Sequence, residues 1–235
     1  MPLSDTFAIA RLFPASNPDV IQLYSFPTPN GVKISIALEE TSLPYEPHRI
    51  DIMKDVQKTP EFLALNPNGK IPAIIDPHGP DGQPIGLFES GAILSWIAEK
   101  TGKLTPVDAG GRLEMLQWLF FQVGGVGPMF GQFGYFYKFG GAKLEDPHSL
   151  NRYRDESRRL LGVLETRLED RDWIMGETYT MADIAIFPWV NAMRGFYDAG
   201  ETLKLAEFGR VMSWLDTCLA RPAVKRGMTI PEKDG

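Results

Sequence analysis

Residues 21–40 read IQLYSFPTPNGVKISIALEE. The stretch 21–26 alternates apolar and polar side chains and is rich in β-formers, whereas the run from Val32 to Glu40 repeats its apolar residues at helical spacing. This pattern predicts a strand, a tight turn and a helix. Thr28 can cap that helix, Pro29 suits its first turn, and the free N–H groups at a helix start attract an anion.

The turn has the form in which thioredoxin-like redox proteins carry Cys-x-x-Cys, namely a strand followed by x-Pro-x-x at a helix start. Here Thr28 and Gly31 stand in the two cysteine positions. Any sulfur chemistry at this turn must therefore use a thiol that the protein does not supply. The simpler alternative is that Thr28 is only a helix cap.

The composition is that of an ordinary globular chain, with 235 residues, 43% hydrophobic and 23% charged. This length suggests one large or two small domains. The net charge of −6 argues against nucleic acid as the main partner, because phosphate binding needs a basic face. The single cysteine, Cys218, excludes an internal disulfide framework, fits a reducing, cytoplasmic setting and reads as a buried packing residue.

Further sequence features narrow the class of protein. No segment approaches the ~18 apolar residues of a membrane span, and the N-terminus lacks the basic and apolar regions of a signal peptide. The three histidines, His48, His78 and His148, are scattered and lack metal-ligand spacing. We therefore expect a soluble cytoplasmic protein with no metal and with neither a membrane nor a nucleic acid as partner.

The first part of the chain reads as an α/β unit preceded by an extension. Residues 1–20 form the extension, in which Pro14, Asn17 and Pro18 break any regular element. Residues 21–103 read as β-α-β-α-β-β-α. The expected strands are 21–26, 45–50, 71–75 and 85–88, and the expected helices are 32–40, 60–65 and 91–100.

A boundary rich in Pro and Gly follows at 104–111, and beyond it residues 112–235 are expected to form a second, all-α domain. Helical stripes run over 112–123 and 152–168. Thr180-Met181-Ala182-Asp183 has capping-box spacing, with Asp in place of the usual Glu, so we interpret it as a folding signal rather than a catalytic pair. The Gly124-Gly125-Val126-Gly127 run follows a helix and precedes no Lys-Ser/Thr pair, which indicates close helix packing rather than a phosphate loop.

Two further motifs can meet the Thr28-Pro29-Asn30 turn in one cleft of the α/β unit. In Asn68-Gly69-Lys70-Ile71-Pro72, a proline that opens a strand, and that can be cis, leaves the Ile71 backbone to pair with an extended peptide. Lys70 can then meet the carboxylate of that peptide. In Phe88-Glu89-Ser90-Gly91, the helix start and the Ser90 hydroxyl suit a carboxylate, while Glu89 suits an ammonium. Together these motifs describe a small peptide with an amino-acid head and a C-terminal carboxylate, which glutathione fits.

The same motifs resemble those of glutathione transferases. The likeness extends from Ile21 to about Met228, and the stretches similar to the bacterial nu class, which is related to fungal Ure2p-like proteins, are Leu23–Gly31, Asn66–Ala73 and Leu87–Ile93. Gln117–Met129 resembles the same class. The resemblance implies a thioredoxin-like N-terminal domain, an all-helical C-terminal domain and a homodimer.

The resemblance also implies roles for individual residues. Ile71 would pair with the cysteinyl backbone of glutathione before a cis Pro72, and Lys70 would hold the glycyl end. Glu89 and Ser90 would hold the γ-glutamyl end, and Gln57 would also contact glutathione. Thr28 and Asn30 would approach the sulfur. Two glutathione molecules can occupy such a site, with Arg152 directed to a carboxylate of the second, although from the sequence alone Arg152 is more simply a solvated helix charge.

The chemistry expected at this site is thiol–disulfide exchange. Tyr24 and Ser25 carry hydroxyls near the turn, but both lie in the strand, so Thr28 is the better-placed group. A hydroxyl, the Asn30 amide and a helix N-terminus each stabilise a thiolate, and such groups lower a thiol pKa from about 8.5 by roughly one or two units. Because the thiolate is the species that attacks a disulfide, the sequence predicts a glutathione-dependent disulfide-bond reductase.

Two other functions stay open at this point. One is a transferase that conjugates glutathione to electrophiles, or a peroxidase, and relative rates on a small disulfide and a chlorinated aromatic would separate it from a reductase. The other is a regulatory protein that binds glutathione with little catalysis. The short extension without a Gln/Asn-rich tract favours an enzyme over that reading. The aromatic run Phe130–Phe139 suits a wall for the second substrate and core packing equally well.

Overall fold

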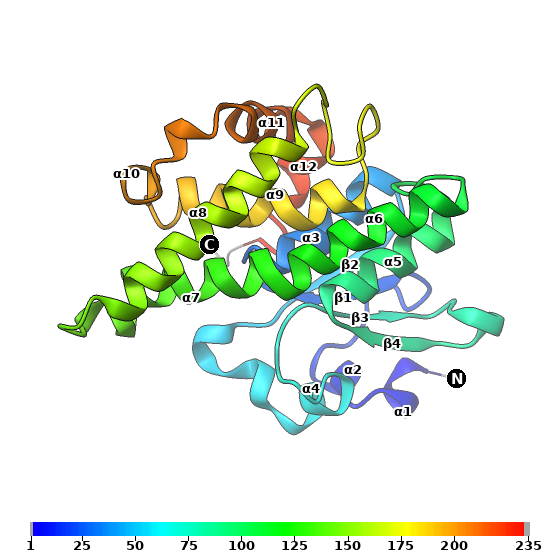
Figure 1. The fold of residues 1–235 in the computed structure, drawn as a ribbon. Helices are drawn as coiled ribbons and strands as arrows, with labels where there is room; N and C mark the ends of the chain where they lie inside the picture. The colour runs from blue at the N-terminus through cyan, green and yellow to red at the C-terminus, as the bar shows by residue number, and fades with distance from the viewer. Residues whose placement is uncertain (1, 233–235) are drawn as a thin grey trace. The chain divides into compact units, whose positions relative to one another are not determined.

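The computed structural model describes residues 2–232, which pack into two compact units (Figure 1). The first unit contains the chain up to Lys103 and again from Pro222, and the second contains Leu104–Arg221. Among the described residues, no helix is long and apolar enough to cross a membrane.

A mixed four-stranded sheet in the order β2-β1-β3-β4 forms the centre of the first unit. Its strands are β1 (Ile21–Ser25), β2 (Tyr45–Arg49), β3 (Ala73–Asp76) and β4 (Ile85–Phe88). Helix α3 (Gly31–Thr41) connects β1 to a parallel β2, whereas β3 pairs antiparallel with both β1 and β4. Helices α4 (Pro60–Leu65) and α5 (Ser90–Thr101) complete the predicted β-α-β-α-β-β-α order, which is confirmed with ends shifted by at most two residues.

The start of β3 differs from the expected position because proline cannot donate to the ladder. The strand was expected from Ile71, but its first paired residue is Ala73, which lies opposite Tyr24 of β1 and Phe88 of β4. Pro72 lacks an N–H group and so stands just outside the sheet. The segment that precedes β3 is therefore left out of the sheet.

Helix α3 lies deep in the first unit, and the last helix of the chain packs against it. Every residue of α3 from Gly31 to Leu38 is buried. Helix α12 (Pro222–Gly227) approaches so closely that a Cβ on Gly227 would lie 2.7 Å from the Ile36 backbone, and Ser35 Oγ donates to Gly227 O at 2.6 Å. The expected second domain ran to residue 235, whereas the segment from Pro222 groups with the first unit because of this packing.

The expectation that residues 1–20 form an irregular extension is wrong. They contain two short helices, α1 (Leu3–Thr6) and α2 (Ile9–Leu12). Leu3, Ile9 and Ala10 are buried in one hydrophobic cluster with Phe62 of α4. The prolines that suggested irregular structure come after both helices, and the apolar residues before them provide enough buried surface to hold the segment against the unit.

The second unit is built from helices, as predicted. They are α6 (Ala109–Phe121), a π-helix (Gln122–Val126), α7 (Gly127–Lys138), α8 (His148–Arg167), α9 (Met181–Arg194), α10 (Gly200–Leu203) and α11 (Gly209–Ala220). The glycine run lies in and just after the π-helix. A Cβ on Gly127 would lie 2.6 Å from Gln122 Nε2, so the expected close packing is confirmed there, whereas a Cβ on Gly124 would meet nothing within 4 Å.

The capping box predicted at the start of α9 is present. The Asp183 carboxylate accepts hydrogen bonds from Thr180 N, Ile174 N and Trp214 Nε1, each at 2.9 Å. Burial raises the pKa of Asp183 to about 6, and these hydrogen bonds oppose that rise. Asp183 thus joins α9, the loop before it and α11, which is the folding role that the spacing indicated.

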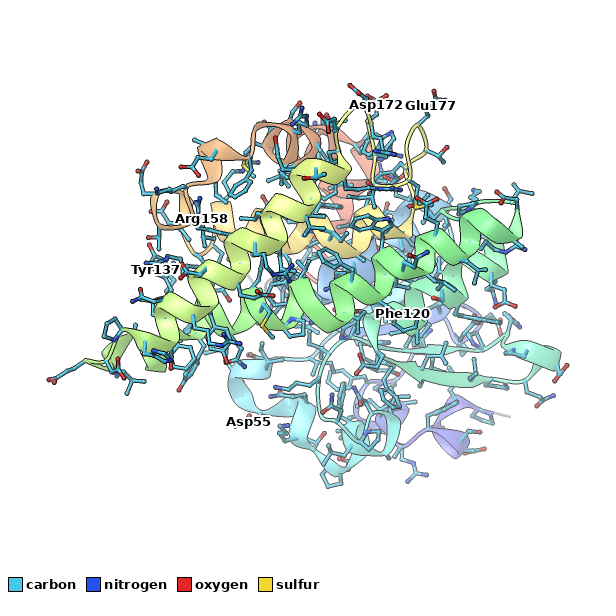
Figure 2. All side chains as sticks on the ribbon, in the orientation of Figure 1. Asp55, Phe120, Tyr137, Arg158, Asp172 and Glu177 are labelled. Atoms are coloured by element: carbon cyan, nitrogen blue, oxygen red, sulfur yellow. The ribbon has the colours of Figure 1, made fainter. Side chains whose placement is uncertain are left out.

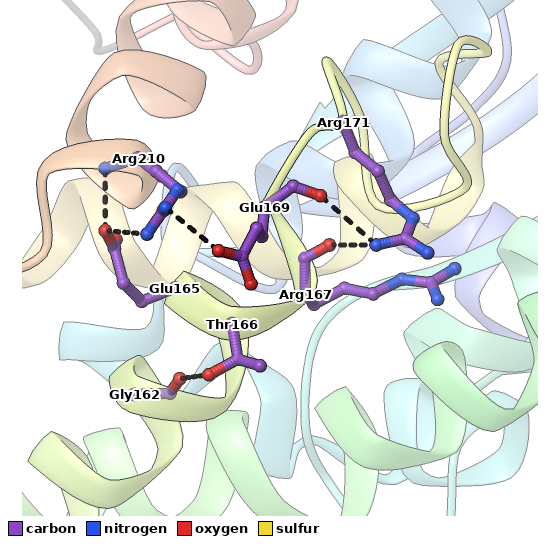
Figure 3. A network of polar contacts seen from close by, with 7 residues as sticks. All are labelled: Gly162, Glu165, Thr166, Arg167, Glu169, Arg171 and Arg210. Atoms are coloured by element: carbon purple, nitrogen blue, oxygen red, sulfur yellow. Dashed lines mark hydrogen bonds and ion pairs between the residues drawn. The ribbon is translucent and has the colours of Figure 1, made fainter.

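A charged network joins the end of α8 to the start of α11 (Figure 3). Glu165 accepts hydrogen bonds from the backbone N–H groups of Arg210 at 3.1 Å and Val211 at 3.0 Å. The Arg210 side chain contacts Glu165 at 3.5 Å and Glu169 at 3.3 Å. Glu165 therefore supplies acceptors to first-turn donors of α11, a helix whose own N-cap residue, Phe208, makes no side-chain cap.

Candidate functional site

The β1–α3 turn holds Thr28 at the start of α3. Thr28 Oγ1 accepts a hydrogen bond from Gly31 N at 3.3 Å, and Thr28 O accepts one from Val32 N at 3.0 Å. The hydroxyl therefore accepts from the first residue of α3, but the N-cap position of that helix is Asn30 and not Thr28, so the predicted cap is displaced by two residues. A hydroxyl that accepts in this way keeps its own proton to donate to a further group.

Gly31 fills the second cysteine position of the turn for a steric reason. A Cβ there would lie 1.9 Å from Phe26 O and 2.6 Å from Ser25 Oγ. Contacts this short do not occur between real atoms, so any side chain at position 31 would force the backbone apart. The geometry of this turn excludes a cysteine at position 31.

Tyr24 and Ser25 are both buried in β1, as expected from the sequence. The Tyr24 ring stacks on His48 with centroids 4.8 Å apart. Burial, assisted by the nearby charge of Glu46, raises the pKa of the Tyr24 hydroxyl far above its ordinary value. Neither hydroxyl is therefore suited to activate a thiol, which leaves Thr28 as the candidate.

Lys33 contacts two of the predicted motifs and is not among the residues that the sequence analysis identified. It is fully buried in α3, and its Nζ donates to Asn30 Oδ1 at 2.8 Å and to Ser90 Oγ at 3.3 Å. Burial lowers the pKa of Lys33 to about 7, while the charge of Glu89 acts in the opposite direction. The lysine thus joins two motifs that the sequence analysis identified separately.

The turn before β3 is organised by Asn66. Its Nδ2 donates to Lys70 O at 2.6 Å, and its Oδ1 accepts from Asn68 N at 3.0 Å. Gly69 has φ +61°, a left-handed conformation that favours glycine. Lys70 is exposed, and the Ile71–Pro72 peptide is cis, as predicted.

The start of α5 carries an unusual backbone conformation at Glu89. Its φ is +68° and its ψ is 114°, a region that residues with a side chain rarely adopt. Glu89 is exposed and Ser90 is buried. Strain of this kind persists only where the surroundings enforce it, and it gathers at ligand sites.

Gln57 lies in a short 3₁₀ helix (Val56–Lys58) and is buried. Its Nε2 donates to Asp55 Oδ1 at 3.3 Å and to Ile52 O at 3.4 Å. Within the part of the chain that the structure describes, its Oε1 is buried without a hydrogen-bond partner. A buried acceptor of this kind normally has a donor, and a bound ligand can provide one.

The remaining candidate residues that the sequence analysis identified lie in the second unit. Arg152 is exposed on α8, where the hydrogen bond from Arg159 lowers the pKa of Glu156 and the charge of Arg152 acts in the same direction. Cys218 is buried on α11. The aromatic run divides, since Phe130 and Phe133 are buried in the core of that unit while Tyr135 and Phe139 are exposed. Residues 2–232 contain no group of three or more side chains suited to hold a metal ion.

Comparison with known proteins identifies the two halves of the chain. Residues 19–99 match the family model of the glutathione S-transferase N-terminal domain, and residues 128–222 match that of the glutathione S-transferase C-terminal domain. The disulfide-bond oxidoreductase YfcG of Escherichia coli strain K12 is 45% identical over 211 residues, which cover 89% of this chain and 94% of YfcG.

Solved structures similar to this chain contain glutathione. A glutathione transferase from Burkholderia graminis, with two glutathione molecules bound per subunit, is 57% identical with a TM-score of 0.96, and the match covers 98% of this chain and 96% of that one. A glutathione transferase from Pseudomonas putida, with one glutathione disulfide bound per subunit, is 52% identical with a TM-score of 0.95 over 97% of this chain and 98% of that one.

Proposed function

The chain belongs to the glutathione S-transferase family, and from that membership we propose that it is a glutathione-dependent disulfide-bond reductase whose site is built on the β1–α3 turn. The observation that carries the proposal is this turn itself. It presents Thr28 at a helix start and excludes a cysteine at position 31, so the exchanging sulfurs come from glutathione and its substrate. The name of YfcG, a disulfide-bond oxidoreductase, supports the same reaction class.

The side chains of the first unit suit the two ends of glutathione. We assign the γ-glutamyl end to Glu89 and Ser90 at the start of α5, where the helix N-terminus favours a carboxylate and Glu89 favours an ammonium. We assign the glycyl carboxylate to Lys70, which is exposed beside the β3 turn. The buried Oε1 of Gln57 needs a donor, which an N–H group of the peptide can supply.

The middle of glutathione is assigned to the segment that precedes β3. Ile71 lies just before the first ladder residue, Ala73, so its backbone can pair with the cysteinyl residue in the manner of an added strand. Pro72 ends the ladder at this point because it has no N–H group. This pairing would direct the cysteinyl sulfur toward the β1–α3 turn.

Glutathione supplies the reducing chemistry, since the thiols of two glutathione molecules together lose two electrons to one substrate disulfide and leave as glutathione disulfide, while two substrate thiols are released. The residues of the chain act on the sulfur. Thr28 donates its hydroxyl proton in a hydrogen bond, the Asn30 amide provides a second donor, and the helix N-terminus favours the negative charge. Each of these contacts stabilises a thiolate more than a thiol and so lowers the pKa of the thiol.

The Thr28→Ala variant tests this assignment. Because a hydrogen bond to a charged group is worth about 1.5–3 kcal/mol, we expect the rate of disulfide reduction to fall about ten- to a hundredfold. The measurement is steady-state reduction of the disulfide of 2-mercaptoethanol by glutathione, with circular dichroism to show that the variant is folded. Thr28→Ser, which keeps the hydroxyl, is the matched control and should retain most of the rate.

Two results would contradict the proposal. Full activity of folded Thr28→Ala would remove Thr28 from the mechanism. A wild-type enzyme that conjugates a chlorinated aromatic rapidly and leaves disulfides unreduced would make it a conjugating transferase instead.

We further propose that the site takes two glutathione molecules and that Arg152 interacts with a carboxylate of the second. Support comes from the Burkholderia graminis structure, which has two glutathione molecules per subunit, and from the Pseudomonas putida structure, in which one glutathione disulfide is bound. Arg152 is an exposed cation on α8. This assignment rests on the likeness to the nu class, in which we place the chain.

A homodimer in the cytoplasm completes the proposal. Leu113 and Phe120 of α6 are 64% and 69% exposed and lie seven residues apart, on one side of that helix, and Phe120 is labelled in Figure 2. Exposed apolar side chains that gather in this way favour a partner surface. The single cysteine of the chain suits a reducing compartment.

A further inference from the structure

Lys33 directly connects the β1–α3 turn to the start of α5. Its Nζ lies 2.8 Å from Asn30 Oδ1 and 3.3 Å from Ser90 Oγ, although Ser90 is 57 residues away in sequence. The whole side chain is buried. One ammonium group therefore contacts a residue assigned to the sulfur of glutathione and a residue assigned to its γ-glutamyl end.

The contact with Lys33 determines how the Asn30 amide is oriented. An ammonium group only donates hydrogen bonds, so the atom of Asn30 that faces it must be the carbonyl oxygen. The NH₂ group of Asn30 is consequently turned away from Lys33. An amide held in the other orientation would present an oxygen, which repels a thiolate instead of stabilising it.

Lys33 also orients the hydroxyl of Ser90. The Ser90 oxygen accepts a hydrogen bond from Lys33. Its own O–H therefore points elsewhere and can donate to an acceptor such as the α-carboxylate of a γ-glutamyl group. Lys33 thus prepares one donor for the sulfur of the ligand and one for its γ-glutamyl end. Both effects follow from a single charged side chain.

A lysine at a buried helix position costs free energy of folding. Burial of an ammonium disfavours folding unless its hydrogen bonds compensate, whereas an apolar side chain of similar size would pack here without that penalty. The neighbouring positions Val32, Ile34 and Ile36 are apolar and buried. The charge at position 33 therefore calls for an explanation other than packing.

We propose that Lys33 is a positioning residue of the glutathione site, which acts by fixing the Asn30 amide and the Ser90 hydroxyl as donors toward the ligand. The inference rests on the proposed function, because it takes glutathione as that ligand. It goes further in assigning a role to a residue through the two side chains that it contacts, Asn30 and Ser90. Lys33 works through Asn30 for the thiolate and through Ser90 for the γ-glutamyl carboxylate.

The pKa of the bound glutathione thiol is the most direct test, because it does not depend on turnover. We would titrate the complex by the ultraviolet absorbance of the thiolate, with glutathione affinity from calorimetry. In Lys33→Met, which keeps the volume and removes the donors, we expect the thiol pKa to rise by about one unit, so that roughly tenfold less thiolate is present at neutral pH. Lys54→Met, at an exposed lysine of the same unit, is the control and should change neither quantity.

A double-mutant cycle shows whether Lys33 acts through Asn30. In the Asn30→Ala background, Lys33→Met should raise the thiol pKa much less than in wild type, because the amide that Lys33 orients is then absent. Additive effects in the cycle would overturn the proposal. So would an unchanged thiol pKa in folded Lys33→Met.

If Lys33→Met does not fold, the Asn30→Ala variant tests the proposal instead. That variant leaves Lys33 in place, and an unchanged thiol pKa in it would remove the group through which Lys33 is said to act. The two proposals fail separately. Wild-type protein that lowers the thiol pKa but reduces no disulfide would overturn only the reductase function, whereas normal reduction with no effect of Lys33→Met on the thiol pKa would overturn only the role of Lys33.

Discussion

Gly31 determines at the level of a single residue what the β1–α3 turn can do. Because Gly31 has no side chain, its backbone lies so close to Phe26 O that a Cβ there would be only 1.9 Å from that oxygen. Thr28, three residues earlier, caps the same turn with a hydroxyl. In the proposed function, the position of a redox-active cysteine pair thereby becomes a binding site for a thiol that comes from outside.

Lys33 gives the free protein a pH dependence of stability that can be measured without glutathione. Burial lowers its pKa from 10.5 to about 7 in the folded state, against the opposing charge of Glu89. Between these values the unfolded chain binds more protons than the folded one, so the contribution of Lys33 to stability rises with pH. We expect the free energy of unfolding of wild type, minus that of Lys33→Met, to increase by about 1.4 kcal/mol per pH unit above pH 7.

Urea unfolding at several pH values between neutrality and about pH 9 provides this difference. Below pH 7 the difference should be flat, because both states then carry the proton. Parallel stability curves for the two proteins over the whole range would show that Lys33 is not buried as a titrating group.

Residue roles were predictable from the sequence only where a motif marked them. Glu89 and Ser90 stand at the start of α5, as the sequence predicts, whereas α3 begins at Gly31, three residues after Thr28. Lys33 was missed because a lysine in a helix is normally taken as a solvated charge. Its signal was present, since the helix from Val32 to Leu38 has apolar residues on every side and leaves no polar face for it.

Helices and strands were predicted well where the spacing of apolar residues agreed with the turn and capping residues at the ends of the element. Helix α4 and strand β4 have the predicted bounds, Pro60–Leu65 and Ile85–Phe88. The short helices α1 and α2 were missed because four-residue helices carry too few periods to be recognised, and their burial depends on tertiary contacts. The left-handed φ of Glu89 could not be predicted, since it is enforced by the surroundings of α5.

The capping box of α9 is the element whose removal should affect stability without affecting glutathione chemistry. Asp183→Asn replaces one carboxylate oxygen by an NH₂ group that faces donors such as Trp214 Nε1 and Ile174 N. We expect the free energy of unfolding to fall by roughly 2–3 kcal/mol, because buried donors lose their acceptor. Urea unfolding measures the change, and the thiol pKa of bound glutathione should stay at its wild-type value.

A suitable control for that change is Asp216→Asn on α11, where the carboxylate is exposed and its ion pair with Arg194 lies at the surface. Its effect should be within about 0.5 kcal/mol of wild type. Equal effects of the two substitutions would contradict the structural role assigned to Asp183.

At the scale of the whole molecule, the sequence predicted an α/β unit followed by a helical one, and the structure has both. The return of the chain to the first unit from Pro222 onward could not be foreseen, because α12 is a short helix that follows directly after α11 of the second unit. Its place depends on close contact between Gly227 and Ile36, which periodicity does not encode.

The central claim concerns the whole molecule, because it states that no thiol of this chain takes part in disulfide reduction. Cys218 is its only cysteine and is buried in the second unit, so Cys218→Ala tests the claim completely. The loss of one buried sulfur should destabilise the protein by roughly 1 kcal/mol and leave it folded. The deciding measurement is the rate at which folded Cys218→Ala reduces the disulfide of 2-mercaptoethanol with glutathione. We predict a rate equal to that of wild type, and a loss of the activity would contradict the account.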